Sequence, residues 1–226
     1  MQHVIWNRLG FHNLLFWLFA YLVVNPFLAP LPYYQYAVQL LLSLVFFFAL
    51  FAIHKEKKSF PVIVVLLVLT LVSHWLEVLE IVQFSQPVSH GIMIIYLFSL
   101  VYSFGAVIVT AKLVTLRLLS ATMCLYLFIG LLWGVIYAFL ESLVPGSFSG
   151  GTLAQAHASD QVLESFTYFS FITLTTLGYG DITPQTMGAG ALCQAEAIMG
   201  QFYTAVLVAY LVGMYSSSSK RKKPSD

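Results

Sequence analysis

The chain has 226 residues, of which 60% are hydrophobic and only 8% are charged. A soluble domain carries roughly 25% charged residues, so the composition excludes an ordinary soluble protein and predicts an all-α integral membrane protein. The formal net charge of +1 gives no general basis for binding nucleic acid. Cys124 and Cys193 lie in apolar segments, and neither indicates a disulfide or a metal site.

Six apolar stretches have the length that a membrane-spanning helix needs, about 20 residues. They cover residues 11–31, 35–53, 60–83, 92–111, 118–143 and 188–215. Residues 1–10 precede the first stretch and form either a short interfacial helix, anchored by Trp6, or a loosely ordered terminus. No A-x-A site follows the first stretch, so we expect it to be retained as a span rather than cleaved as a signal peptide.

Residues 144–187, between the last two spans, hold an apolar helix too short to cross a membrane, at 161–175. Ser159 or Asp160 is its expected N-cap, with Glu164 in the first turn. The next stretch reads Thr175-Thr176-Leu177-Gly178-Tyr179-Gly180-Asp181, which does not continue a helix. Irregular backbone at membrane depth is tolerated only where protein buries it or a water-filled space lines it. The pattern therefore predicts a re-entrant segment.

Basic residues set the expected orientation, because cytoplasmic loops carry the excess of Lys and Arg. With both termini cytoplasmic, every basic residue lies on that side: Arg8, Lys55, Lys57, Lys58, Lys112, Arg117, Lys220, Arg221, Lys222 and Lys223. The opposite loops contain no Lys or Arg, but they contain Asp160, Glu164 and Asp181, with Glu141 at their edge. Such an acidic outer side raises the local concentration of cations.

Residues 118–215 resemble the pore domain of tetrameric potassium channels, with an outer helix, a pore helix, a filter and an inner helix. Residues Thr175–Asp181 match the signature T-T-V-G-Y-G-D of that family at six positions. The resemblance implies a selectivity filter formed by Thr176, Leu177, Gly178, Tyr179 and Gly180. It implies K+ ions bound by the carbonyl oxygens of the first four residues and by the Thr176 hydroxyl, and no other cofactor. One loop cannot close a ring of carbonyl oxygens, so a four-fold symmetric homotetramer is expected.

Four further residues match family positions that support the filter or its outer mouth, as Thr175 and Asp181 do. Tyr168 and Phe169 stand where relatives carry an aromatic pair, expected behind Tyr179, and an ordinary aromatic core is compatible with this. Glu141 resembles the glutamate that supports the backbone after the filter in voltage-gated relatives. Glu196 is an ionisable group inside a span, which is costly unless paired, and its expected partner is a backbone or hydroxyl group of the pore helix.

Gly200 follows Gly180 by twenty residues, which is the position of the hinge glycine in the family. Glycine weakens a helix by ~1 kcal/mol relative to alanine and permits bending, and close packing against the outer helix is a second interpretation. Ile172 stands where some relatives place a glutamate that bonds the outer aspartate, so that contact is expected to be missing. On one face below Gly200 lie the expected pore-lining residues Thr204, Val208 and Val212.

Residues 1–117 form a four-helix domain with the outline of a voltage sensor but without its charges. The fourth span has one cation, Lys112, near its cytoplasmic end, so opening is not expected to depend steeply on voltage. In the third span, His74, Glu77 and Glu80 follow one another at i, i+3 spacing. They form either a polar contact between helices, a proton sensor or a cation site.

The sequence therefore predicts a potassium channel in a plasma membrane, and we expect a bacterial inner membrane. A weakly selective cation channel and a secondary transporter are the alternatives, although no repeated halves typical of transporters are evident. No nucleophile–base pair, metal cluster or phosphate loop indicates an enzyme. The tail, residues 216–226, carries Lys220, Arg221, Lys222 and Lys223, which either attract anionic lipid or only fix the topology.

Overall fold

The computed structural model describes residues 2–28, 33–53, 60–79, 86–111, 113–159 and 161–220, with side chains from Gly10 to Gly213 within these ranges. The long helices are α1 (Gln2–Leu28), α2 (Tyr34–Ile53), α3 (Phe60–Val78), α4 (Gln86–Val109), α5 (Leu116–Leu143) and α8 (Met187–Lys220). The shorter elements are β1 (Phe148–Ser149), α6 (Gly151–Ala158), α7 (Val162–Leu174) and β2 (Thr183–Pro184). In this part of the chain, six helices are long and apolar enough to span a membrane, which confirms the all-α membrane fold.

The ends of several helices differ from the predicted spans. α1 begins at Gln2 and continues unbroken through Gly10, so residues 2–10 extend the first span instead of forming a separate interfacial helix or a loose terminus. Adding residues to an existing helix costs far less than starting a new one. α4 begins at Gln86 rather than at 92, because Pro87 is tolerated in the first turn of a helix. These differences leave the number of spans unchanged.

Some residues with expected roles lie outside the part of the chain that the structure describes. The side chains of Trp6, Arg8 and Lys220, together with all of residues 54–58, Lys112 and residues 221–226, lie outside the described residues. Their expected roles, as an interfacial anchor and as cytoplasmic charges, stay predictions.

The prediction for the start of the pore helix is wrong at Ser159. This residue ends α6 as its C-cap, and its hydroxyl donates to the Gln155 carbonyl at 3.0 Å. α7 begins at Val162 after Gln161, which makes no side-chain capping hydrogen bond. Glu164 lies in the first turn of α7 as expected, and Asp160 lies outside the described residues.

The chain divides into two compact units. The first contains Met1–Thr110 and Thr115–Phe128, and the second contains Ala111–Val114 and Ile129–Asp226. α5 therefore gives its first half to one unit and its second half to the other. The domain boundary at 117/118 stays a prediction.

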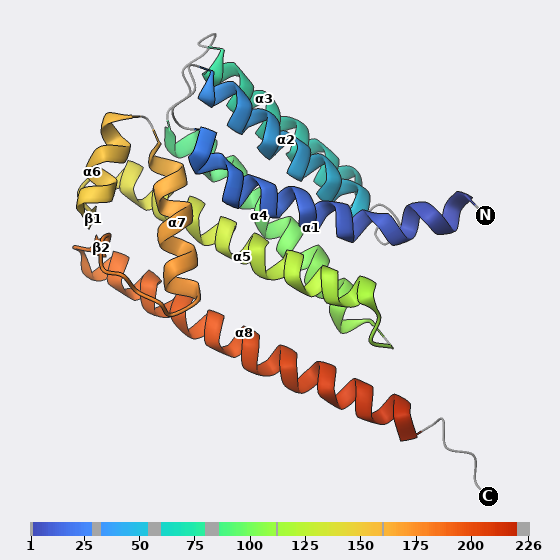
Figure 1. The fold of residues 1–226 in the computed structure, drawn as a ribbon. Helices are drawn as coiled ribbons and strands as arrows, with labels where there is room; N and C mark the ends of the chain where they lie inside the picture. The colour runs from blue at the N-terminus through green and yellow to red at the C-terminus, as the bar shows by residue number, and fades with distance from the viewer. Residues whose placement is uncertain are drawn as a thin grey trace, which may run out of the picture. The chain divides into compact units, whose positions relative to one another are not determined.

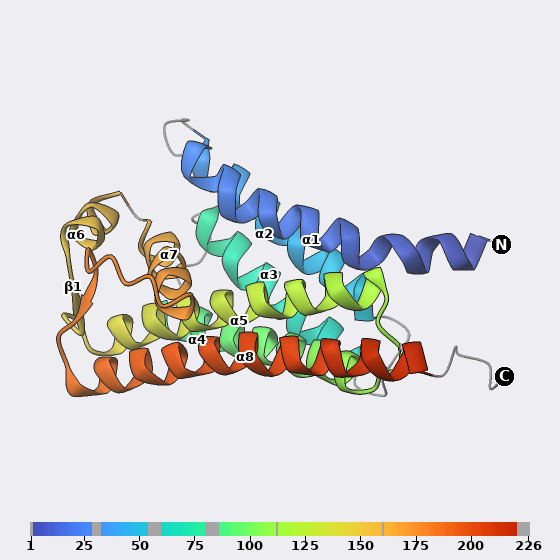
Figure 2. The same cartoon turned by 60° about the horizontal axis from the view of Figure 1, so that its bottom comes forward.

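The first unit is a helical bundle with an aromatic core. α1 and α2 run side by side (Figures 1 and 2), and α3 packs against α4. Phe46 of α2 and Tyr96 of α4 meet edge to face, with ring centroids 4.9 Å apart. Phe11 of α1 meets Phe104 of α4 in the same way at 5.5 Å. These pairs fix the helices because edge-to-face contacts add to the burial of the rings themselves.

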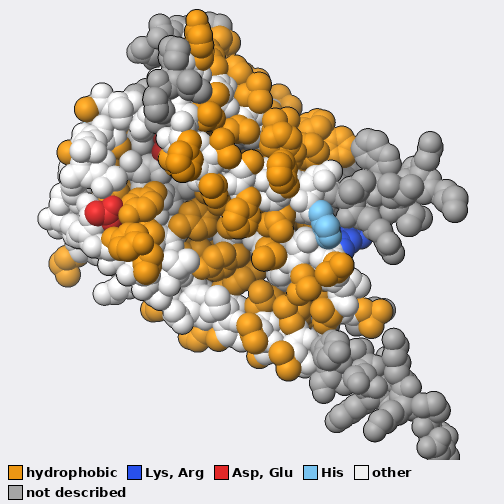
Figure 3. Space-filling view, in the orientation of Figure 1, with side chains coloured by type: hydrophobic (Ala, Val, Ile, Leu, Met, Phe, Trp, Pro, Cys, Tyr) orange, Lys and Arg blue, Asp and Glu red, His pale blue; other side chains and the backbone are white. Residues whose placement is uncertain are grey.

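The second unit holds the segment that the sequence singles out. β1 and β2 form a short antiparallel pair next to α6 (Figure 1), with Phe148 opposite Pro184 and Ser149 opposite Thr183. This pair joins the chain before α6 and α7 to the chain after Asp181. α7 packs against α8. Hydrophobic side chains cover much of the face in Figure 3 and charged ones are sparse there, as expected for surfaces in contact with lipid.

Candidate functional site

The loop after α7 has a backbone of alternating handedness. Thr176, Gly178 and Gly180 have φ values of 59°, 58° and 78°, whereas Leu177 and Tyr179 between them have negative φ. Alternation of right- and left-handed residues turns successive N–H groups to one side of the chain, so the carbonyl groups face the other side. Glycine adopts the left-handed conformation freely, which explains two of the three positions.

Hydrogen bonds show which side the N–H groups face. The amides of Leu177 and Gly178 donate to the Ile172 carbonyl at 2.9 and 3.2 Å, and the Thr176 amide donates to the Thr173 carbonyl at 2.9 Å. The amides thus face the end of α7. Within the described residues, no backbone N–H donates to the carbonyl oxygens of residues 176–179. The loop therefore has a row of carbonyl oxygens available on the side away from α7.

Several contacts hold the outer end of this loop. The Thr152 hydroxyl donates to the Asp181 carboxylate at 3.2 Å. Burial and the interaction with Asp181 raise the pKa of Tyr168 above its usual value. Ile172 has no polar side-chain group, so Asp181 is held instead by Thr152, a donor that the sequence did not reveal.

Glu141 anchors the turn that leads into β1. Its carboxylate accepts hydrogen bonds from the amides of Gly146 at 2.8 Å and Phe148 at 3.0 Å. Because Phe148 pairs with Pro184, the carboxylate supports the chain after the loop indirectly, through the strand pair. The Gln185 amide adds a bond to the Ser147 carbonyl at 2.8 Å.

The two residues of the aromatic pair, Tyr168 and Phe169, lie in different environments. Tyr168 lies next to Asp181, at the outer end of the loop. The ring of Phe169 lies 5.2 Å from Tyr137 and 5.7 Å from Phe148, in a cluster that joins α5, β1 and α7. Phe169 is therefore part of an aromatic core within the single chain.

Comparison with known proteins agrees with this geometry. Residues 124–217, somewhat less than half of the chain, match the protein-family model described as "Ion channel". This segment is similar to an ion-channel domain. Ion channels are not enzymes, as the sequence predicts, and the spanning helices make the chain a multi-pass membrane protein. No curated protein and no solved structure matches the chain.

Within residues 124–217, Glu196 of α8 is fully buried where α8 meets α5 and α7. The Tyr137 hydroxyl of α5 donates to Glu196 Oε2, and the Ser170 hydroxyl of α7 bonds to Glu196 Oε1. The expected hydroxyl partner is therefore present on α7, at Ser170. Tyr137 was missed, and its only signal in the sequence is a hydroxyl group in an apolar span.

The number of protons in this cluster indicates that Glu196 is neutral. The Ser170 hydroxyl has one proton but two acceptors in reach, since the Gly130 carbonyl lies 2.7 Å from its oxygen. If Glu196 is protonated on Oε1, it donates to Ser170, and Ser170 donates to Gly130. Tyr137 then donates to Oε2, and every group is satisfied. A neutral carboxyl group also avoids the cost of a buried charge inside the membrane.

Gly200 lies where α8 meets the end of α7. A Cβ atom at this position would overlap the Leu174 carbonyl oxygen, so only glycine fits without a shift of the backbone. The close contact is with α7 and not with the outer helix, and α8 is continuous through Gly200. A hinge at Gly200 stays a prediction.

The three expected pore-lining residues are not covered by the rest of the chain. Thr204, Val208 and Val212 are all exposed in the single chain. The Thr204 hydroxyl bonds to the Gln201 carbonyl of its own helix at 3.0 Å. Their role in lining a pore stays a prediction.

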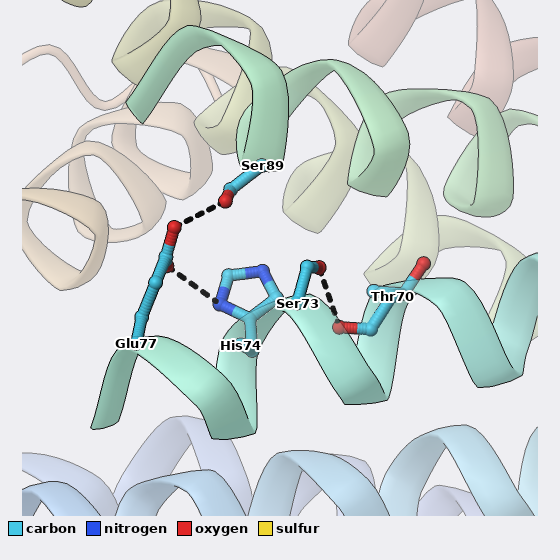
Figure 4. A network of polar contacts seen from close by, with 5 residues as sticks. All are labelled: Thr70, Ser73, His74, Glu77 and Ser89. Carbon is cyan, nitrogen blue, oxygen red and sulfur yellow. Dashed lines mark hydrogen bonds and ion pairs between the residues drawn. The ribbon is translucent and has the colours of Figure 1, made fainter. Parts of the chain in front are cut away.

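In the first unit, a polar network joins α3 to α4 (Figure 4). Glu77 accepts a hydrogen bond from Ser89 and lies 4.0 Å from His74 Nδ1. The buried atoms His74 Nε2 and His90 Nδ1 have no hydrogen-bond partner within the described residues. The part of the chain that the structure describes contains no group of three or more His, Cys, Asp or Glu side chains that could hold a metal ion. Glu80 lies outside the described residues, so its part in a cation site stays a prediction.

Proposed function

We propose that the chain forms a potassium-selective channel with residues 176–180 as its filter. The observation that carries this proposal is the alternating backbone of the loop, whose amides bond to α7 and leave its carbonyl oxygens available. Rings of backbone carbonyl oxygens replace the hydration shell of K+ in selectivity filters. Conduction then proceeds by loss of water at the filter and by movement of several ions between adjacent sites.

The pore helix supports the same function. α7 runs from Val162 to Leu174 and ends directly at the filter. The C-terminal end of a helix carries a partial negative charge. This charge stabilises a cation that has lost part of its water near the filter.

The channel is proposed to be a homotetramer, because one loop supplies only one side of a carbonyl ring. Exposure supports this assembly. Leu177 and Tyr179 are 54% and 66% exposed in the single chain. Only 11% of the most apolar stretch of α8 is buried within the single chain, whereas 67% of the corresponding stretch of α5 is buried. Four copies with α8 nearest the axis would cover the filter side chains and part of α8.

The orientation follows from the basic residues, with both termini cytoplasmic and the filter near the outer face. We place the channel in a plasma membrane, and a bacterial inner membrane fits its composition. Opening is not steeply voltage-dependent, because α4 contains no Lys or Arg. The basic tail, residues 220–223, is proposed to contact anionic lipid.

Reconstitution in planar bilayers tests the function. With K+ on one side and Na+ on the other, the reversal potential is expected to follow the K+ gradient. Leu177→Val is the matched control and should keep this selectivity, because residue 177 contributes only its carbonyl oxygen. Gly178→Ala should lose it, because alanine disfavours the left-handed φ of 58°. A wild-type reversal potential that does not respond to the K+ gradient would refute the proposal. A reversal potential between the value expected for a K+-selective pore and the value expected for a pore that passes K+ and Na+ equally would indicate a weakly selective cation channel.

A further inference from the structure

One hydrogen bond connects the inner helix directly to the first residue of the filter. Gln201 Nε2 of α8 donates to Thr176 Oγ1 at 3.1 Å. Both side chains are exposed in the single chain, so close packing of a core does not force them together. Gln201 follows Gly200, whose contact with the Leu174 carbonyl fixes this part of α8 against the end of the pore helix.

The backbone of Thr176 needs such support. Among the described residues it is the one non-glycine residue with a positive φ. A β-branched side chain disfavours the left-handed region, so neighbouring groups have to hold it there. The Thr176 amide bonds to the Thr173 carbonyl of α7 at 2.9 Å, and its hydroxyl bonds to Gln201 of α8. Two helices thus hold the amide and the hydroxyl of Thr176, while its carbonyl oxygen stays available.

The chemistry of the hydroxyl group gives this contact a function. A threonine hydroxyl has one proton and two lone pairs. The amide of Gln201 occupies one lone pair and limits rotation of the hydroxyl, while the second lone pair stays available to an ion. Without the amide, the Thr176 side chain can adopt other χ1 rotamers, and its oxygen then faces the ion for less of the time.

We propose that Gln201 is a positioning residue for the innermost ion site of the filter, acting through the Thr176 hydroxyl. This inference rests on the proposed function of the filter. It predicts that Gln201 sets the affinity of that site for a cation arriving from the side of the α8 C-terminus.

Block by Ba2+ measures this affinity, because Ba2+ is similar to K+ in size and its double charge makes it bind longer at oxygen sites. Ba2+ is applied from the side of the α8 C-terminus to channels in planar bilayers. Gln201→Met keeps the length of the side chain but removes the donor, and it should weaken the block by roughly 3- to 10-fold, the contribution of one neutral hydrogen bond. Gln194→Met makes the same change at another exposed position of α8 and should leave the block unchanged.

A double-mutant cycle shows whether the effect passes through Thr176. In a Thr176→Ala background, Gln201→Met should cause no further weakening. Gln201→Asn serves as a second variant if the methionine variant does not assemble, because it stays polar but is one methylene too short for the bond. Equal block in wild type and both Gln201 variants would overturn the proposal, as would the same weakening in the Thr176→Ala background.

The wild-type reversal potential, recorded in the same bilayers, separates this inference from the proposed function. If it does not follow the K+ gradient, both fail. If it does and the Gln201 variants block like wild type, only the role of Gln201 is refuted.

Discussion

Replacement of Glu196 tests the polar cluster that joins α5, α7 and α8. Glu196→Ala removes the hydrogen bonds with Tyr137 and Ser170. Each contributes about 0.6–1 kcal/mol. The buried Tyr137 hydroxyl loses its acceptor, which costs about 1–3 kcal/mol. The expected loss is therefore about 2–5 kcal/mol per chain.

Glu196→Gln separates a neutral carboxyl group from a charged one. A glutamine donates from Nε2 to Ser170 and accepts from Tyr137 with Oε1, which reproduces the protonated acid. Its expected cost is therefore below about 1 kcal/mol. If Glu196 is instead ionised, the amide loses a charge-assisted interaction, and the cost approaches that of the alanine variant.

Thermal unfolding of the purified protein in detergent measures the difference. At about 2–4 °C per kcal/mol for a chain of this size, Glu196→Ala should lower the midpoint by about 4–20 °C. Tyr137→Phe removes one donor and leaves the buried Glu196 Oε2 without a partner, so it should lower the midpoint by about 2–12 °C, from a loss of about 1–3 kcal/mol. A glutamine variant as unstable as the alanine variant would refute the neutral state of Glu196.

The remaining predictions concern other parts of the chain. The conductance–voltage curve should be shallow, because moving one charge through the field supplies only about 2.3 kcal/mol per 100 mV and α4 carries no Lys or Arg; a slope of several elementary charges contradicts this. Gly200→Ala should destabilise the protein in a melting assay, because its Cβ would overlap the Leu174 carbonyl, whereas Gly213→Ala, with nothing within 4 Å, should not. His74→Ala should leave the dependence of channel activity on pH, over about pH 5 to 8, unchanged, because its contact with Glu77 serves helix packing; a shifted profile would identify a proton sensor.

The spanning helices could be predicted from composition, because length and hydropathy alone decide whether a helix can cross a membrane. Their ends could not, since capping is local: Ser159 has the chemistry of an N-cap but ends the preceding helix. β1, β2 and α6 were missed because elements of two to eight residues carry little periodic signal.

The candidate site could be predicted in part. Gly178 and Gly180 indicate where the backbone turns left-handed, but the positive φ of Thr176 depends on contacts that no local pattern contains. The partners Tyr137 and Gln201 depend on which faces of distant helices meet. The position of a polar residue in an apolar span predicts its depth in the membrane, but it does not predict which residue of a neighbouring helix it contacts.

The strand pair between Phe148 and Pro184 gives this segment a modular character. The chain leaves at β1, forms α6, α7 and the loop that we propose as the filter, and returns at β2 to the residue opposite its starting point. Segments whose two ends lie together are the ones that proteins exchange and accept as insertions. Residues 148–184 are thus suited to transfer as one unit into another protein, provided that the host supplies a carboxylate like Glu141 for the entering turn.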